Sequence, residues 1–144
     1  MDPQTRGYSL SCERNRQPIL MVLKDHFADR REVLEVGSGT GQHAAYFSDA
    51  LRHLIWQASD RKDYLHGIGQ WLLEAQRHDL PPPMELDVNG HWPKKRYDAV
   101  FSANTFHIMS VVEVEKFFKG VDHCLSADGK LVLYGPFNYN GEYT

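Results

Sequence analysis

The chain has 144 residues, of which 42% are hydrophobic and 24% charged, and its formal net charge is −3. This composition suits one packed domain and excludes a largely disordered chain. The negative charge argues against nucleic-acid binding through phosphate neutralisation, and no apolar run is long enough to span a bilayer. Cys12 and Cys124 are far apart in the sequence, which is typical of free thiols, so we expect a cytoplasmic protein.

The spacing of apolar residues predicts alternating helices and strands. Residues 1–12 are polar, and we expect a mobile arm there, followed by a single domain over 13–144. The elements expected in that domain are, in chain order, helix 18–27, strand 32–36, helix 44–51, strand 54–58, helix 64–75, strand 84–88, strand 97–102, helix 111–125 and strand 130–134.

Alternation of this kind predicts an α/β fold, a three-layer sandwich with a mostly parallel sheet and right-handed crossovers. In such a sheet the ligand crevice lies at the carboxyl ends of the strands. The chemically interesting side chains of this sequence follow predicted strands, so we expect them to meet at that edge.

The most informative segment is the glycine-rich loop after the first strand, in the sequence Glu-Val-Gly-Ser-Gly-Thr-Gly-Gln over residues 35–42. Its glycines follow a G-x-G-x-G pattern, whereas a dinucleotide fingerprint requires G-x-G-x-x-G. An acid before the loop favours a positively charged ligand over a phosphate. S-adenosylmethionine, with its sulfonium and ammonium groups, fits this pattern, and the ligand-binding residues expected here are Glu35, Gly37, Ser38, Gly39 and Gly41.

Two acids follow the second and third strands. Asp60, with Arg61 beside it, lies about 20 residues after the loop, where a carboxylate can accept hydrogen bonds from a ribose diol. Asp87 can accept from the amine of a purine, with Val88 as an apolar neighbour of the base. The alternatives are a helix N-cap for Asp60 and an ordinary turn for Asp87.

The segment after the fourth strand is where an acceptor and a transferred group would meet. Methyl transfer from a sulfonium is an in-line displacement that depends mainly on alignment. His107 could serve as a general base, and Asn104 could orient the acceptor or contact the methionine part of the cofactor. The alternative for His107 is a packing or helix-start histidine.

These features together resemble the Rossmann-like class of S-adenosylmethionine-dependent methyltransferases. The resemblance is closer to the methyltransferase-like family called domain of unknown function 938, and it rests on segments 11–15, 18–20, 38–43, 56–60, 86–88, 104–108 and 134–137. It implies the sheet order 3-2-1-4-5 for the five strands predicted here, whereas the class has seven. We expect the last two strands of the class to be absent, either because the domain is C-terminally incomplete or because the protein is a natural short form. The resemblance also places Arg14 and Asn15 at the open side of the cofactor, where Arg14 could pair with a carboxylate. The alternative is an Arg14 side chain in solvent.

We therefore expect an S-adenosylmethionine-dependent methyltransferase that acts on a small-molecule acceptor and produces S-adenosylhomocysteine. A non-catalytic module that binds either compound remains an alternative, and an NAD-dependent oxidoreductase is opposed by the spacing of the glycines. The histidines are scattered, so we expect no metal site. The uncovered apolar edge strand leads us to expect a homodimer through that edge, and we expect neither nucleic-acid nor membrane partners.

Overall fold

The computed structural model describes residues 7–103, 109–135, 138–139 and 142–143. Its main sheet has four parallel strands in the order β2-β1-β5-β6, and β3, which follows β2 in the chain, pairs with β4. Taking β2 and β3 as one interrupted strand, this is the expected order 3-2-1-4-5. The strands are β1 (Glu32–Glu35), β2 (Ile55–Gln57), β3 (Ser59–Asp60), β4 (Met84–Glu85), β5 (Tyr97–Ala103) and β6 (Leu125–Tyr134), followed by an antiparallel pair, β7 (Asn138–Tyr139) and β8 (Glu142–Tyr143).

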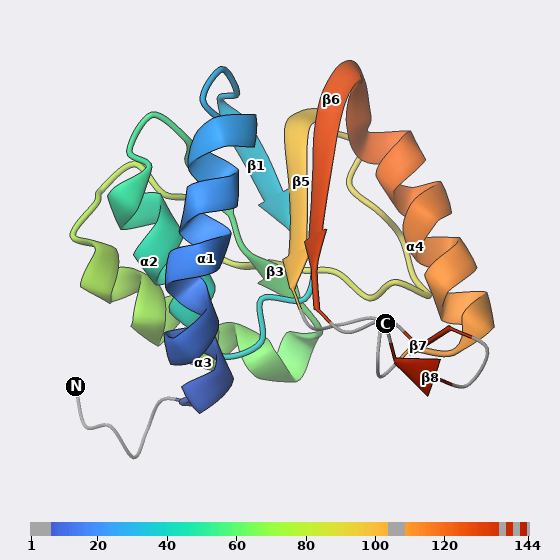
Figure 1. The fold of residues 1–144 in the computed structure, drawn as a ribbon, viewed down its shortest axis with the longest axis horizontal. Helices are drawn as coiled ribbons and strands as arrows, with labels where there is room; N and C mark the ends of the chain where they lie inside the picture. Colours follow the sequence, from blue (N-terminus) through green and yellow to red (C-terminus); the bar gives the residue numbers. More distant parts are fainter. Residues whose placement is uncertain (1–6, 104–108, 136–137, 140–141, 144) are drawn as a thin grey trace.

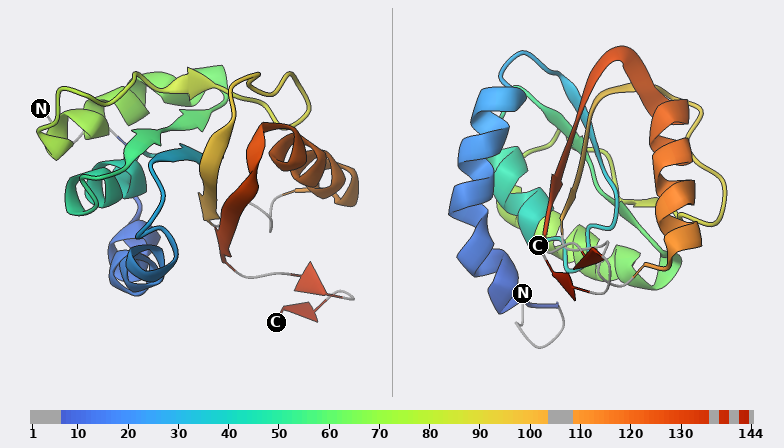
Figure 2. Two further views of the ribbon diagram at one scale, coloured as in Figure 1. Left: turned by 90° about the horizontal axis from the view of Figure 1, so that it is seen from above. Right: turned by 45° about the vertical axis from the view of Figure 1, so that its right-hand side comes forward.

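The sheet is a middle layer between two groups of helices (Figures 1 and 2). These are α1 (Leu10–His26), α2 (Gln42–Ala50) and α3 (Leu65–Leu72) on one face and α4 (Val111–Cys124) on the other, with short 3-10 turns at Lys62–Tyr64 and Leu73–Ala75. Side chains alternate along the strands because successive residues point to opposite faces. Val33, Ala99 and Phe101 therefore pack with α1, α2 and α3, whereas Leu34 and Val100 pack with α4.

The second expected strand, 54–58, is interrupted at Ala58 by the glycine-rich loop. β1 ends at Glu35, so it offers no further backbone to pair with the chain at Ser59. Ser38 of the loop takes that place, since its N–H donates to the Ser59 carbonyl at 2.8 Å and its hydroxyl accepts from the Ser59 N–H at 3.0 Å. The loop is thus bonded directly to the neighbouring strand, which fixes its position over the edge of the sheet.

The first helix begins earlier than expected, and this corrects the boundary of the N-terminal arm. α1 starts at Leu10 instead of Pro18, and therefore includes residues 10–12 that we assigned to a mobile arm. Ser9 is the N-cap, with its hydroxyl accepting from the Cys12 N–H at 3.3 Å. Pro18 removes one helical N–H, but its ring is exposed, and the buried residues that follow (Ile19, Leu20 and Leu23) anchor the helix on the core.

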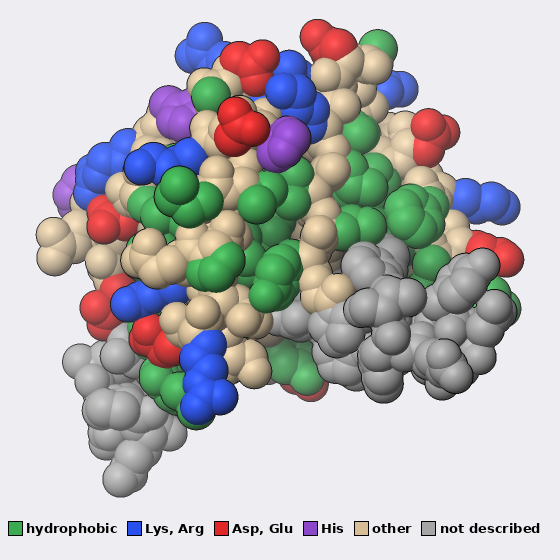
Figure 3. Space-filling view, in the orientation of Figure 1, with side chains coloured by type: hydrophobic (Ala, Val, Ile, Leu, Met, Phe, Trp, Pro, Cys, Tyr) green, Lys and Arg blue, Asp and Glu red, His purple; other side chains and the backbone are tan. Residues whose placement is uncertain are grey.

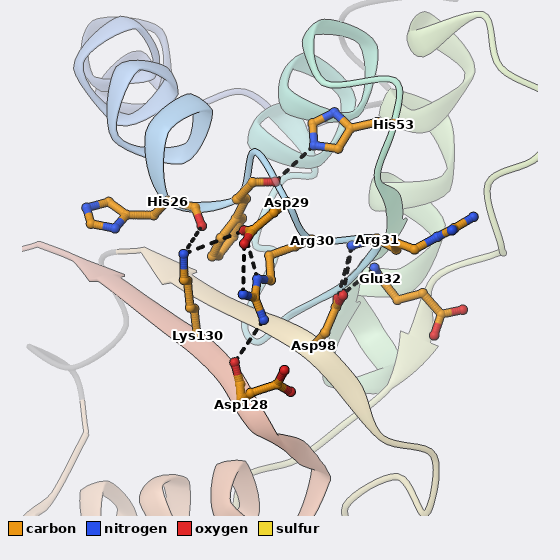
Figure 4. Close-up of polar contacts among 10 residues, drawn as sticks. His26, Asp29, Arg30, Arg31, Glu32, His53, Asp98, Asp128 and Lys130 are labelled. Carbon is orange, nitrogen blue, oxygen red and sulfur yellow. Dashed lines mark hydrogen bonds and ion pairs between the residues drawn. The ribbon is translucent and has the colours of Figure 1, made fainter.

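Polar contacts tie together the edge at which the strands begin (Figure 4). The Asp98 carboxylate at the start of β5 accepts from the backbone N–H groups of Arg31 and Glu32, which lead into β1. The Lys130 ammonium on β6 donates to the His26 carbonyl at the end of α1, at 3.1 Å. These contacts join the starts of β1 and β5 to each other and β6 to the end of α1.

One face of the molecule exposes apolar side chains. Hydrophobic atoms gather between α1 and β6 in Figure 3, and Met21 and Val22 of α1 are 66% and 43% exposed. The edge strand β6 lies beside them and is half-buried over Leu131–Leu133. Within the described ranges, no helix combines the length and the hydropathy that a membrane crossing requires.

Candidate functional site

A cavity of about 830 Å³ lies at the carboxyl ends of the strands. Figure 1 shows the arrowheads of β1 and β5 pointing to the edge of the sheet where α1 begins. The cavity is formed by the first turn of α1, the glycine-rich loop, the ends of β3, β4 and β5, and the start of α4. Eight of the residues predicted from the sequence line it, namely Glu35, Gly37, Ser38, Gly39, Asp60, Arg61, Asp87 and Val88.

The three glycines of the loop all have positive φ angles, but they serve different purposes. Gly39 has a φ of 59°, and a Cβ built on it would meet nothing within 4 Å, so its side faces open space where a ligand can approach the backbone. Gly41 has a φ of 94°, and a Cβ there would lie 2.8 Å from the Ile68 Cα. Gly41 therefore allows α2 to pack against α3. It does not line the cavity, although we predicted from the sequence that it binds the ligand.

Glu35 ends β1 at the bottom of the cavity, and only 2% of it is exposed. Its Oε1 accepts from the Ser38 hydroxyl at 2.8 Å and from the Trp56 indole N–H at 3.1 Å. Burial raises the pKa of Glu35 from 4.5 to about 7, although these two hydrogen bonds act in the opposite direction. A carboxyl group held in this way in a cleft is a candidate functional group, because an ionised carboxylate there needs a cation.

Asp60 closes the second side of the cavity and is bonded to the glycine-rich loop. Its Oδ2 accepts from the Gly39 N–H at 2.8 Å, and its Oδ1 accepts from the Arg61 N–H at 2.7 Å. Each carboxylate oxygen has two acceptor sites, so both oxygens retain the capacity for one further hydrogen bond. Burial raises the pKa of Asp60, and the two backbone N–H groups lower it by less. The N-cap alternative does not describe its contacts, since Asp60 bonds to the loop and to its own neighbour.

Asp87 lies farther along the same wall and has a second, structural role. Its Oδ1 accepts from the Asn89 N–H at 2.9 Å, and this hydrogen bond closes the turn after β4. An ordinary turn was the alternative interpretation of Asp87. Its Oδ2 takes no part in that bond, and the side chain borders the cavity together with Val88. Asn89 in turn donates to Glu113 at 3.2 Å, so the turn is bonded to the start of α4.

The charges around the cavity favour a cation. Glu35, Asp60, Asp87 and Glu113 are its acidic lining residues, whereas Arg61 is the single Lys or Arg among the described residues that line it. Four carboxylates around one ligand disfavour the pyrophosphate of a dinucleotide through like-charge repulsion. The acidic lining therefore agrees with the inference from the glycine spacing that the site does not bind a dinucleotide. It also includes Glu113, an acid that was not predicted from the sequence.

The predicted pair Arg14 and Asn15 does not line this cavity. Both residues lie inside α1, and the Arg14 side chain is exposed, because the helix begins before them and directs its first turn, with Ser9, Ser11 and Cys12, at the cavity instead. Arg14 in solvent was the alternative, and it is the arrangement observed. Asn104 and His107, the predicted catalytic residues, lie outside the described residues.

The residues that hold α1 over the loop were not among those predicted from the sequence. The Gln42 side-chain amide accepts from the Ser9 N–H and donates to the Ser9 carbonyl, the latter at 3.1 Å. The Trp71 indole of α3 donates to the Gly7 carbonyl. These are contacts between segments more than 30 residues apart, and no local pattern indicates them. By contrast, the Ser-x-x-Glu pattern at Ser110 and Glu113 is a capping-box signature that could have identified the start of α4.

Several solved structures with the same fold are described as methyltransferases. The S-adenosylmethionine-dependent methyltransferase SibL, in its apo form, matches with a TM-score of 0.77 and 19% identity over 92% of this chain and 38% of that chain. An O-methyltransferase family protein from Burkholderia thailandensis matches with a TM-score of 0.72 and 16% identity over 85% of this chain and 38% of that chain. The glycopeptide N-methyltransferase MtfA, complexed with sinefungin, matches with a TM-score of 0.70 and 18% identity over 80% of this chain and 47% of that chain.

These similarities define a Rossmann-like methyltransferase fold, and the chain spans less than half the length of each of the three proteins. The chain itself belongs to the family described as protein of unknown function DUF938, whose pattern matches residues 6–144. The family resemblance expected from the sequence is thereby confirmed.

Proposed function

We propose that the chain binds S-adenosylmethionine in the cavity at the carboxyl ends of the strands and transfers its methyl group to a small-molecule acceptor. The observation that carries this proposal is the buried Glu35 at the bottom of the cavity, beside the open backbone of Gly39. A carboxylate at that depth is stabilised by a cationic ligand, and the ligand must also approach the loop closely. An α-amino acid joined to a nucleoside through a sulfonium satisfies both requirements.

Each part of the cofactor has a matching group in the cavity. Glu35 would hold the ammonium, and Asp60, whose oxygens each accept one backbone N–H, would accept the ribose hydroxyls. Asp87 and Val88 would hold the adenine through its amine and its apolar face. The cofactor supplies an activated methyl group, and the chain aligns the reactants and excludes water around them.

The fold of the similar structures supports a cofactor of this class. SibL is described as S-adenosylmethionine-dependent, and MtfA was solved with sinefungin. Coclaurine N-methyltransferase, a further structure with a TM-score of 0.63 and 20% identity, was solved with S-adenosylhomocysteine. The same fold carries both O- and N-methyltransferases, so it leaves the acceptor open.

Isothermal titration calorimetry tests the proposal directly. We expect S-adenosylhomocysteine and S-adenosylmethionine to bind with one site per chain, and NADH to give no heat. Saturable NADH binding without binding of either adenosyl compound would overturn it in favour of an oxidoreductase. A second measurement follows labelled methyl groups into a panel of O-, N- and S-acceptors. Tight binding without transfer to any member would support the non-catalytic binding module instead.

A further inference from the structure

The carboxyl group of Glu35 uses only one of its two oxygens in the fold. Oε1 accepts both hydrogen bonds, from the Ser38 hydroxyl and from the Trp56 indole. Oε2 has no partner among the described residues, yet it is not one of their unpartnered side-chain atoms that solvent cannot reach. Since the side chain lines the cavity, Oε2 is the oxygen that a ligand there can contact.

The described lining places no cation beside this group. Arg61 is the single Lys or Arg in that lining, and its backbone bonds to Asp60. The other acids of the lining, Asp60, Asp87 and Glu113, add negative charge to the same cavity. Burial, and to a smaller extent the charge of Asp60, raise the pKa of Glu35 to about 7. The free chain therefore keeps a proton on Glu35 through part of the neutral range.

Three further titratable groups face the cavity from the elements around Glu35, namely Cys12 of α1, His43 of α2 and Asp60 of β3. Burial raises the pKa of the Cys12 thiol and lowers that of His43 to about 4, so both groups are neutral between pH 6 and 8. Burial also raises the pKa of Asp60, although two backbone N–H groups favour its ionised form. Asp60 is therefore the rival source of any proton that a ligand displaces.

The ammonium of an adenosyl amino acid changes the balance at Glu35. A cation within hydrogen-bond reach favours the carboxylate and lowers its pKa by about 1 to 3. The O–H bond of the carboxyl group then breaks, the electron pair stays on Oε2, and the proton passes to the buffer. The ammonium keeps its three protons, so one proton leaves the site for each protonated chain that binds a ligand.

We propose that ligand binding in this cavity is coupled to proton release, because the ammonium of the ligand displaces the proton that the buried Glu35 carboxyl group holds in the free chain. The inference rests on the proposed function and deepens it, since it adds a regulation by pH to the ammonium site. The cavity then binds its ligand more tightly as the pH rises through neutrality.

Calorimetry in buffers with different ionisation enthalpies counts the protons released. We expect S-adenosylhomocysteine to release about 0.4 to 0.9 proton at pH 6 and about 0.1 at pH 8, with an affinity about 5- to 10-fold higher at pH 8. S-adenosyl-4-thiobutyrate keeps the nucleoside, the sulfur and the carboxylate but lacks the ammonium, and we expect it to release no proton. Equal release by the two ligands would overturn the coupling to the ammonium.

Three substitutions identify the group that loses the proton. Glu35→Gln should release none and should bind S-adenosylhomocysteine with the same affinity at pH 6 and pH 8. Asp60→Asn should keep most of the release. Glu32→Gln is the matched control and should behave as wild type, because Glu32 pairs with Lys95 outside the cavity lining. Release that persists in Glu35→Gln and disappears in Asp60→Asn would assign the proton to Asp60 and overturn the inference.

The outcomes separate the two proposals. If S-adenosylhomocysteine binds the wild-type chain without releasing a proton at pH 6, the inference fails while the proposed function stands. Failure of the wild-type chain to bind S-adenosylhomocysteine at either pH would overturn the proposed function itself. Thermal unfolding followed by circular dichroism identifies a variant that does not fold, and the two ligands on the wild-type chain remain decisive in that case.

Discussion

Replacing Glu35 with glutamine separates two effects of this buried acid, namely its effect on the stability of the fold and its role in ligand binding. The amide has nearly the shape of the protonated carboxyl group, and its oxygen can still accept from the Ser38 hydroxyl and the Trp56 indole. The substitution therefore removes the charge and leaves the packing and these two hydrogen bonds in place. Any dependence of the difference between wild type and variant on pH then reports the ionisation of Glu35.

The magnitude follows from the pKa of the folded chain. Burial raises the pKa of Glu35 from 4.5 to about 7, and at about 1.4 kcal/mol per pKa unit this corresponds to about 3 kcal/mol. Between these two pKa values the folded chain keeps the proton that the unfolded chain has released. The contribution of Glu35 to folding is therefore most favourable below pH 4.5 and is lost as the pH rises through 7. The glutamine variant has no ionisable group at position 35, so its stability does not fall in this way as the pH rises.

Urea unfolding at several pH values between 4 and 8 measures the effect. We expect the free energy of unfolding of Glu35→Gln, relative to wild type, to rise by about 3 kcal/mol between the two ends of that range. A difference that stays constant across the range would refute the argument that burial controls this group. Glu32→Gln is the matched control, because Glu32 lies on the same strand but pairs with Lys95 at the surface, and its effect should stay below about 1 kcal/mol.

The same variant should bind the cofactor less well. If Glu35 holds the ammonium, its neutralisation removes a charge-assisted hydrogen bond, and we expect S-adenosylhomocysteine affinity at pH 8 to fall by about 1–3 kcal/mol. A variant that is more stable at high pH yet binds more weakly would show that the buried acid is retained for its ligand. Unchanged affinity would remove Glu35 from the ammonium site.

Four further outcomes are expected. Asp60→Ala should weaken S-adenosylhomocysteine binding by about 1–3 kcal/mol in calorimetry, and unchanged affinity would remove Asp60 from the ribose site. Gly41→Ala should lower stability by more than about 2 kcal/mol in urea unfolding, because its Cβ would lie 2.8 Å from backbone, whereas Gly39→Ala meets open space and should cost about 1 kcal/mol; the reverse order would contradict the packing role. His107→Ala should reduce turnover about 10²–10⁴-fold if His107 is a general base, and an unaltered rate would leave it a structural residue. Light scattering should detect a dimer that forms through the exposed edge of β6, and a monodisperse monomer would count against it.

The sequence determined the type and order of the elements because the patterns that encode them are local. Apolar runs marked the buried strands, helical spacing marked α2, α3 and α4, and the glycines after β1 marked the loop. Right-handed crossovers and the class resemblance were then enough to arrange the strands. The acids at Glu35, Asp60 and Asp87 were assigned to one edge because each follows a parallel strand, and the structure brings all three to the cavity.

The tertiary structure alone decided how those residues are used. Whether Glu35 is a surface acid or a buried one depends on Trp56 and Ser38, and the bond from the indole spans 21 positions in the chain. The start of α1 could not be placed from its own residues, since it is fixed by Gln42 and Trp71, which bind the backbone of residues 7–9 from other helices. Local patterns specify which elements form, whereas burial, capping and unpaired polar atoms arise only when distant segments are packed together.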